Sequence, residues 1–77
     1  MSKLTIISPK DMVKILESLG FIEIRQKGSH KSFRHKDGRT AVIPFHSEDL
    51  GRGLLRKILR DVKLTPDDYE SIRKKIK

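Results

Sequence analysis

Gly28, Ser29 and His30 form a short turn that ends on a histidine, three residues before Phe33. A glycine supplies the positive φ that a two-residue turn requires, and the alternation after it predicts a strand that begins at His30. Imidazole accepts or releases a proton near neutral pH more readily than any other side chain. His30 is therefore a candidate for acid–base chemistry, with the alternative that it is only a polar strand residue.

The charged residues near His30 are mostly cations, among them Arg25, Lys27 and Arg34. This combination suits RNA cleavage, because the ribose 2′-hydroxyl is itself the nucleophile and the enzyme supplies a base and cations that stabilise the phosphorane. We expect His30 to take the proton and the three cations to contact the phosphate. Further RNA contacts are expected from Gly28, Ser29 and Ser32. The same residues also suit RNA binding without catalysis.

Metal-dependent hydrolysis and a nucleophilic triad have little support in the sequence. The histidines at 30, 35 and 46 lack the i,i+4 helical spacing of a zinc site, and no carboxylate-rich motif accompanies them. Neither a G-x-S-x-G elbow nor a Walker-type glycine loop occurs. We expect neither a metal ion nor a small-molecule cofactor.

The length and charge of the chain restrict the class of protein. Its 77 residues predict a single domain over 1–77. Lys and Arg number 18 against 10 Asp and Glu, and the resulting charge of +8 favours a polyanionic partner. Nucleic acid is favoured over a membrane, because the basic residues are spread over several expected elements. The apolar stretch at residues 4–7 is too short for a signal peptide or a membrane span, which predicts a cytoplasmic protein.

Capping patterns predict the first and last helices. Ser8, Pro9 and Asp11 are typical of N-cap, N1 and N3, and apolar residues follow at helical spacing up to Gly20. Residues 65–68 repeat this pattern before a short C-terminal helix.

Residues 21–27, 30–36 and 39–44 alternate as three strands. We expect two-residue turns at Gly28-Ser29 and at Asp37-Gly38, which pair 27 with 30, 24 with 33, 36 with 39, and 33 with 42. The core face would then hold Ile22, Ile24, Phe33, Val42 and Pro44. The opposite face would hold Glu23, Arg25, Lys27, His30, Ser32, Arg34, Arg39, Ala41 and Ile43. A bulge at Gly28 would exchange the two faces. His35 shares the face of Phe33 and is therefore expected to have a structural role.

The second helix is expected to be capped by Ser47 or Asp49 and to bury a leucine-rich stripe. Arg52, Arg56 and Arg60 recur every four residues, about 6 Å apart along the axis, which suits successive phosphates of an RNA strand. A solvated helix face is the alternative.

The expected fold is α+β, double-stranded-RNA-binding-like, in the order α-β-β-β-α, with a three-stranded antiparallel sheet, helices on one face and a short C-terminal helix.

A family resemblance covers roughly residues 11–64 and is carried by a set of residues between Gly28 and Leu59. The set comprises Gly28, Ser29, His30, Phe33, Asp37, Gly38, Arg39, Ile43, Pro44, His46, Leu50, Gly53, Leu55, Arg56, Ile58 and Leu59. Together they resemble the HicA family, the toxins of prokaryotic HicA–HicB toxin–antitoxin pairs. The resemblance implies a double-stranded-RNA-binding-like fold and ribosome-independent mRNA cleavage with the histidine of Gly-Ser-His, here His30, as catalytic residue. It also implies a HicB-like antitoxin that covers the active site.

The predicted function is accordingly a metal-independent endoribonuclease toxin that cleaves mRNA. Two alternatives remain open: a non-catalytic RNA-binding module of the same fold, and a protein-interaction module whose basic face recognises an acidic partner. RNA that is bound but left intact would identify the first alternative. Weak RNA affinity with tight binding to an acidic protein would identify the second.

Overall fold

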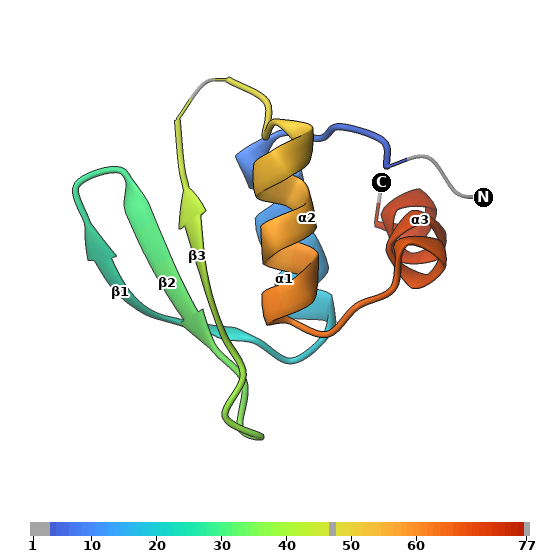
Figure 1. Cartoon of the computed structure of the whole chain (residues 1–77). Coiled ribbons are helices and arrows are strands. Elements are labelled where there is room, and N and C mark those ends of the chain that lie inside the picture. The colour runs from blue at the N-terminus through green and yellow to red at the C-terminus, as the bar shows by residue number, and fades with distance from the viewer. Residues whose placement is uncertain (1–3, 47, 77) are drawn as a thin grey trace.

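The computed structural model of the chain describes residues 4–46 and 48–76. Its elements are α1 (Pro9–Ser18), β1 (Ile22–Lys27), β2 (His30–Arg34), β3 (Thr40–Pro44), α2 (Arg52–Asp61) and α3 (Pro66–Lys75). The three strands form one antiparallel sheet in the order β1-β2-β3 (Figure 1). The order α-β-β-β-α, followed by a third helix, confirms the predicted α+β fold class.

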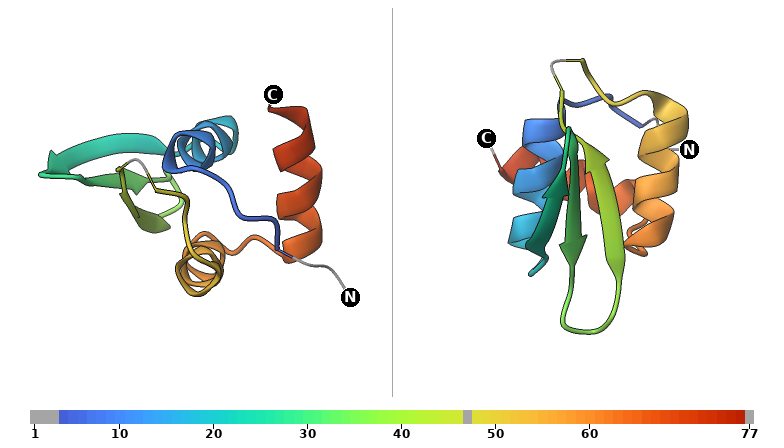
Figure 2. Two further views of the ribbon diagram at one scale, coloured as in Figure 1. Left: turned by 90° about the horizontal axis from the view of Figure 1, so that it is seen from above. Right: turned by 90° about the vertical axis from the view of Figure 1, so that its left-hand side faces the viewer.

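The elements are arranged in three layers (Figure 2). The sheet is the first layer, α1 and α2 lie side by side against one of its faces, and α3 packs behind them, away from the sheet. The opposite face of the sheet is covered by no helix or strand of the described chain. We call this uncovered face the open face.

Side-chain caps define where α1 and α3 begin. The backbone N–H of Asp11 donates to Ser8 Oγ at 3.1 Å, and that of Asp68 donates to Thr65 Oγ1 at 3.1 Å. Each cap satisfies one of the free N–H groups of the first turn, and each helix has proline where a missing N–H has no cost. Both predicted starts are confirmed.

The second helix begins later than expected. Gly51 is the N-cap residue of α2 and makes no side-chain cap. Capping by Asp49 is therefore wrong, while Ser47, the other expected cap, lies outside the described residues. A start at Arg52 keeps Gly51 out of the helix interior, where glycine costs about 1 kcal/mol relative to alanine.

Fifteen described apolar side chains form the core between the layers. Those fully buried include Phe33 and Ile43 from the sheet and Leu55 and Ile58 from α2. Removing one such side chain from water stabilises the fold by about 1.5 to 3 kcal/mol. Tyr69 brings α3 into this core, and its hydroxyl donates to the carbonyl of Thr5.

The first hairpin has the expected two-residue turn but acquires a β-bulge in β1. Glu23, not Ile24, lies opposite Phe33, because the register shifts between Glu23 and Arg25. The expected pairing of residues 24 and 33 is wrong for this reason. Ile22 and Ile24 are consequently 68% and 50% exposed and do not enter the core.

The second hairpin turns over three residues, not two. The N–H of His35 donates to the carbonyl of Arg39 at 2.8 Å, and the N–H of Gly38 donates to the carbonyl of His35 at 2.9 Å. Gly38 has φ +100°, so the geometry is that of a three-residue loop whose last residue is left-handed. The expected pairs 36 with 39 and 33 with 42 are therefore wrong, and Phe33 pairs with Ala41.

A register shift of one residue exchanges the faces of a strand. The side chains expected on the open face but found on the helix side are Glu23, Arg39, Ala41 and Ile43. Those expected in the core but found on the open face are Ile22, Val42 and Pro44. The open face as observed carries Ile22, Arg25, Lys27, His30, Ser32, Arg34, Thr40, Val42 and Pro44.

Candidate active site

The β1–β2 turn places His30 at the start of β2. Gly28 has φ +58°, which allows Lys27 and His30 to pair directly across the turn, with no bulge there. Two hydrogen bonds hold this turn: Gln26 Nε2 donates to the carbonyl of Gly28 at 3.1 Å, and the N–H of Phe45 donates to the carbonyl of Ser29. His30 is exposed, and β2 fixes the direction in which its imidazole leaves the sheet.

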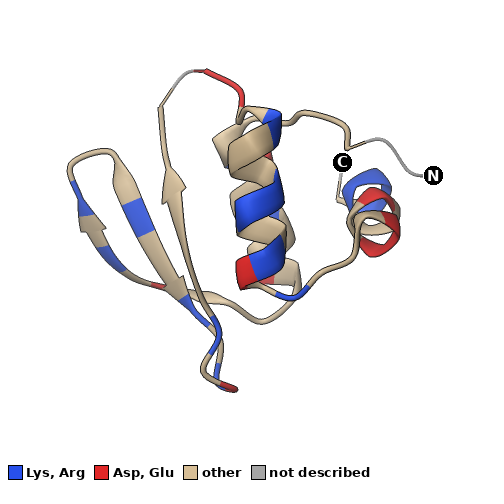
Figure 3. Ribbon diagram, viewed as in Figure 1, with Lys and Arg blue, Asp and Glu red and all other residues tan. Residues whose placement is uncertain are grey.

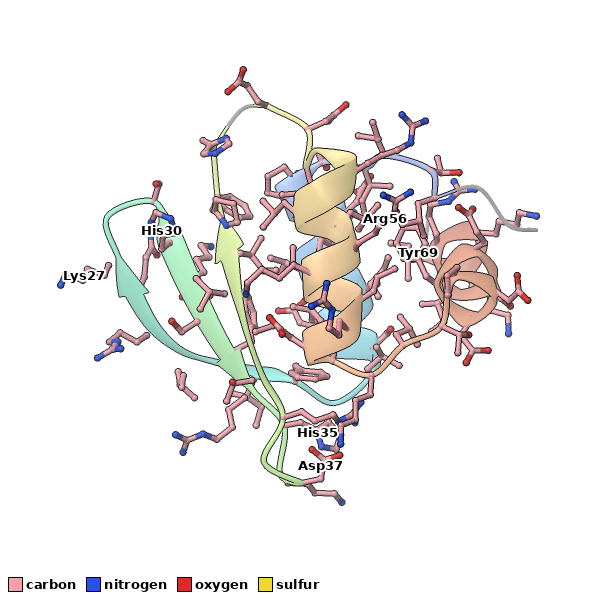
Figure 4. The ribbon with its side chains drawn as sticks, in the orientation of Figure 1. Lys27, His30, His35, Asp37, Arg56 and Tyr69 are labelled. Carbon is pink, nitrogen blue, oxygen red and sulfur yellow. The ribbon has the colours of Figure 1, made fainter. Side chains whose placement is uncertain are left out.

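The register brings the predicted basic residues onto the same face as His30. Lys27 lies directly across from it on β1 (Figure 4). Arg25 is the diagonal neighbour on that strand, and Ser32 and Arg34 follow along β2. Directly opposed side chains in an antiparallel pair have Cβ atoms about 4.5 to 5.5 Å apart. Lys27 and His30 are therefore direct cross-strand neighbours at the turn.

The three cations on this face make no ion pair within residues 4–46 and 48–76. Every acidic side chain with a salt bridge there is bound to another basic residue, for example Glu23 to Lys31 at 3.8 Å. Arg25, Lys27 and Arg34 are thus available to an external anion.

Lys31 lies on the opposite side of β2 from His30. Its ammonium is 4.0 Å from the ring centroid of Phe45 and forms the ion pair with Glu23. Lys31 follows His30 in the sequence but lies outside the candidate site, because successive side chains of a strand point to opposite faces.

His35 has the structural role expected from its face. Its Nε2 lies 3.1 Å from the carbonyl oxygen of Leu19, and its ring meets Phe21 edge-on at 5.2 Å. Its Nδ1 accepts from the N–H of Asp37 at 3.1 Å. The hydrogen bond from the N–H of Arg39, reinforced by the Arg39 guanidinium, holds the pKa of Asp37 below its ordinary value.

The arginine stripe of Arg52, Arg56 and Arg60 is exposed, but it does not adjoin His30. These side chains lie on α2 away from its buried residues, and α2 covers the face of the sheet opposite the open face. Arg56 points toward the α3 side of the molecule, whereas His30 lies at the far tip of the sheet (Figure 4). Basic residues lie on the strands, on the β2–β3 turn, on α2 and on α3 (Figure 3).

Three apolar side chains that the sequence pattern predicts in the core lie on or beside the open face. Ile22, Ile24 and Val42 are 68%, 50% and 47% exposed, next to the cations of β1 and β2. Their alternation with polar residues predicts that they are buried. They are exposed because the bulge in β1 and the three-residue β2–β3 turn shift the register of the strands. Gly38 was the available signal, because glycine fits the last position of a three-residue loop as well as a two-residue turn.

A cleft of about 590 Å³ lies elsewhere, between β3, the turn before it and the C-terminal half of α2. Lys57, Asp61 and Lys63 line its helix side, and Lys57 pairs with Asp61 at 3.0 Å. None of the predicted site residues lines it.

Residues 4–46 and 48–76 contain neither a cluster of metal-binding side chains nor a membrane-spanning helix. No three His, Cys, Asp or Glu side chains are grouped so that they could hold a metal ion. No described helix is both long enough and apolar enough to cross a membrane.

The fold and the site together define a class of protein: a small basic α+β domain whose open sheet face carries an exposed histidine among cations that make no ion pair with the described residues. A search of curated proteins returned no match. The model of the HicA toxin family of bacterial toxin–antitoxin systems matches residues 9–64, and the chain belongs to this family. It is therefore the toxin of such a system, and membership implies a cognate antitoxin. The match ends before α3, so this helix lies beyond the part shared with the family model.

Proposed function

We propose that this toxin is a metal-independent endoribonuclease that cleaves mRNA in the cytoplasm, with His30 as the catalytic residue. The observation that carries the proposal is the exposed imidazole of His30 at the tip of the open face, beside Lys27, Arg25 and Arg34, which have no ion-pair partner among the described residues. An anionic substrate and a proton acceptor can meet there.

The proposed reaction uses the nucleophile that RNA itself carries. His30 takes the proton of the 2′-hydroxyl, whose oxygen then attacks the adjacent phosphorus, and the 5′-oxygen leaves. Lys27 and Arg25 stabilise the charge on the phosphorane from the neighbouring strand. The products are a 2′,3′-cyclic phosphate and a 5′-hydroxyl. DNA resists cleavage because it lacks the 2′-hydroxyl.

The remaining RNA contacts follow from the placement of the predicted residues. Gly28, Ser29 and Ser32 contact the strand around His30, together with Arg34. Arg52, Arg56 and Arg60 bind a more distant segment of the RNA, which must pass round the molecule to reach α2. Because the molecule measures 35 × 29 × 23 Å, several nucleotides are needed to connect the two surfaces.

The antitoxin is proposed to be HicB-like and to cover the open face. Ile22, Ile24 and Val42 support this, because exposed apolar side chains beside cations suit a protein partner with apolar and acidic residues. Such a partner would exclude RNA from His30 by occupying the same surface.

Incubation of the purified protein with a defined single-stranded RNA in EDTA tests the proposal. We expect the wild type to generate 2′,3′-cyclic phosphate ends, and His30→Ala to lose at least about 100-fold in rate, as removal of a general base does. His30 is exposed, so the variant should retain the wild-type circular dichroism spectrum and RNA affinity. A matched DNA should remain intact.

Two results would contradict the proposal. Full activity in His30→Ala would remove the catalytic role of this residue. Intact RNA with folded, RNA-bound wild-type protein would identify a non-catalytic RNA-binding module.

A further inference from the structure

Pairing between β2 and β3 continues past the end of β3. His30 pairs with Pro44, and the N–H of Phe45 then donates to the carbonyl of Ser29. The same register puts the next residue, His46, opposite Gly28 at the turn. The loop after β3 thus brings a second histidine to the tip that carries the first.

Alternation along the strand decides the side on which His46 emerges. Phe45 faces the helix side, where its ring meets the ammonium of Lys31 at 4.0 Å. Continued alternation of side chains beyond Pro44 would put His46, the residue after Phe45, on the side of Pro44 and His30, the open face. His46 is exposed.

The separation of the two histidines suits a single phosphodiester. Diagonal neighbours on one face of an antiparallel pair are about 7 to 8 Å apart, within reach of ring side chains. His30 and His46 occupy such positions across β2 and the continuation of β3. A phosphate between them would have an imidazole near the 2′-oxygen and another near the 5′-oxygen.

We propose that His46 is the general acid of the reaction, a proposal that rests on the proposed ribonuclease function. His30 takes the 2′-hydroxyl proton, the O2′–P bond forms, the P–O5′ bond breaks, and His46 gives a proton to the departing 5′-oxygen. One proton enters the protein at His30 and one leaves at His46, so no co-reactant is needed.

The other side chains near His30 fit this role less well. Lys27 and Arg25 carry several N–H donors and Ser32 carries a hydroxyl, so these side chains are better suited to binding the phosphate by hydrogen bonds. His35 is remote, at the opposite end of β2, where it bonds to the carbonyl of Leu19.

The leaving group provides a test that separates proton donation from binding. One substrate is an ordinary RNA dinucleotide, and the other carries sulfur in place of the bridging 5′-oxygen at the same position. A thiolate departs without being protonated, so a missing general acid does not slow this second substrate. Rates are measured for the wild type, His46→Ala, His46→Gln and His30→Ala. Lys36→Ala serves as a control, because it removes an exposed cation at the distant β2–β3 turn.

We expect both His46 variants to cleave ordinary RNA about 100-fold or more slowly, and the sulfur-bridged substrate within a few-fold of the wild type. His30→Ala should be slow on both substrates, and Lys36→Ala should match the wild type. Circular dichroism and urea unfolding check that each variant is folded.

Each other outcome overturns a specific statement. Wild-type rates on both substrates in the His46 variants would refute the role of His46 while the proposed function stands. Equal slowing on both substrates would show that His46 binds RNA without donating the proton. Failure of the wild type to cleave either substrate would refute the proposed function itself.

Discussion

Gly20 and His35 meet where the end of α1 approaches the β2–β3 turn. A Cβ built on Gly20 would lie 3.2 Å from His35 Nε2, and Gly20 has φ +95°. His35 Nε2 also lies 3.1 Å from the carbonyl of Leu19. A side chain at position 20 would thus be strained in its backbone and would press on a ring that joins α1 to the sheet.

Gly20→Ala should destabilise the protein by about 1 to 3 kcal/mol, because backbone strain and the crowded ring add together. The matched control is Gly53→Ala, at an exposed position in α2 where the added Cβ meets no atom within 4 Å beyond its chain neighbours and the backbone of its own helix. That change should stabilise the protein by up to about 1 kcal/mol, because alanine favours helix. Urea unfolding of both variants checks the prediction, and a Gly20→Ala midpoint at or above that of the wild type would contradict it.

At the scale of the single element, α2 carries the arginine stripe on an exposed face. Its side chains project from one face of a helix whose other face is buried against the sheet. Arg52, Arg56 and Arg60 make no ion pair in the described chain, unlike Lys57, which pairs with Asp61 on the same helix. The stripe is therefore a separate cationic surface on the side away from His30.

Replacing Arg52, Arg56 and Arg60 together by Gln should weaken binding of single-stranded RNA and lower its salt slope by about 2, as loss of three phosphate contacts does. The control is a variant in which Lys14, Lys74 and Lys75 are replaced by Gln. It loses the same positive charge at exposed positions of α1 and α3. Salt titrations followed by fluorescence anisotropy measure both slopes. Equal losses in the two variants would attribute the effect to net charge and not to the stripe.

At the scale of the whole molecule, α3 is joined to the N-terminal segment. The N–H of Thr5 donates to Glu70 Oε2 at 2.8 Å, and Glu70 also pairs with Arg73 at 2.8 Å. Tyr69 is buried, and this burial, with the charge of Glu70, raises its pKa to about 12. The two ends of the chain thus close one side of the core, and the stability of that side depends on pH.

Glu70→Gln should remove part of the acid sensitivity of the fold. Burial alone would raise the pKa of Glu70, but the hydrogen bonds from Thr5 and Arg73 outweigh it and lower the pKa below 4.5. The carboxylate therefore stabilises the folded state above pH 4.5, and this contribution disappears as the pH falls through the folded pKa. Urea midpoints from pH 7 to pH 3 should show the gap between wild type and variant closing toward acid. A gap that does not change with pH would contradict the assignment.

Local interactions account for what the sequence predicted correctly. Ser8, Thr65 and the prolines that follow them define helix starts through bonds between near neighbours. Gly28 and Ser29 likewise specify the two-residue turn at His30, because few residues tolerate positive φ. The α+β order and the surplus of positive charge also follow from composition and periodicity alone.

The tertiary structure decided which side chains of the strands lie on each face of the sheet. Asp37-Gly38 suits both a two-residue and a three-residue turn, and the choice between them changes the register by one. In the folded protein, burial of Ala41 and Ile43 and the bond from Arg39 to the carbonyl of Val62 accompany the longer turn. Such contacts join residues far apart in the sequence, so no local pattern records them.

The sequence by itself therefore determined the order of the elements, the caps of α1 and α3, the turn that presents His30 and the basic character of the protein. Tertiary structure decided that Ile22 and Val42 lie on the open face, that the arginine stripe is separated from His30, and that Phe45 continues the pairing that brings His46 to the tip. Short-range hydrogen bonds and backbone preferences govern the first group. Packing of the sheet against α1 and α2 governs the second, because a shift of one residue reverses every side chain of a strand.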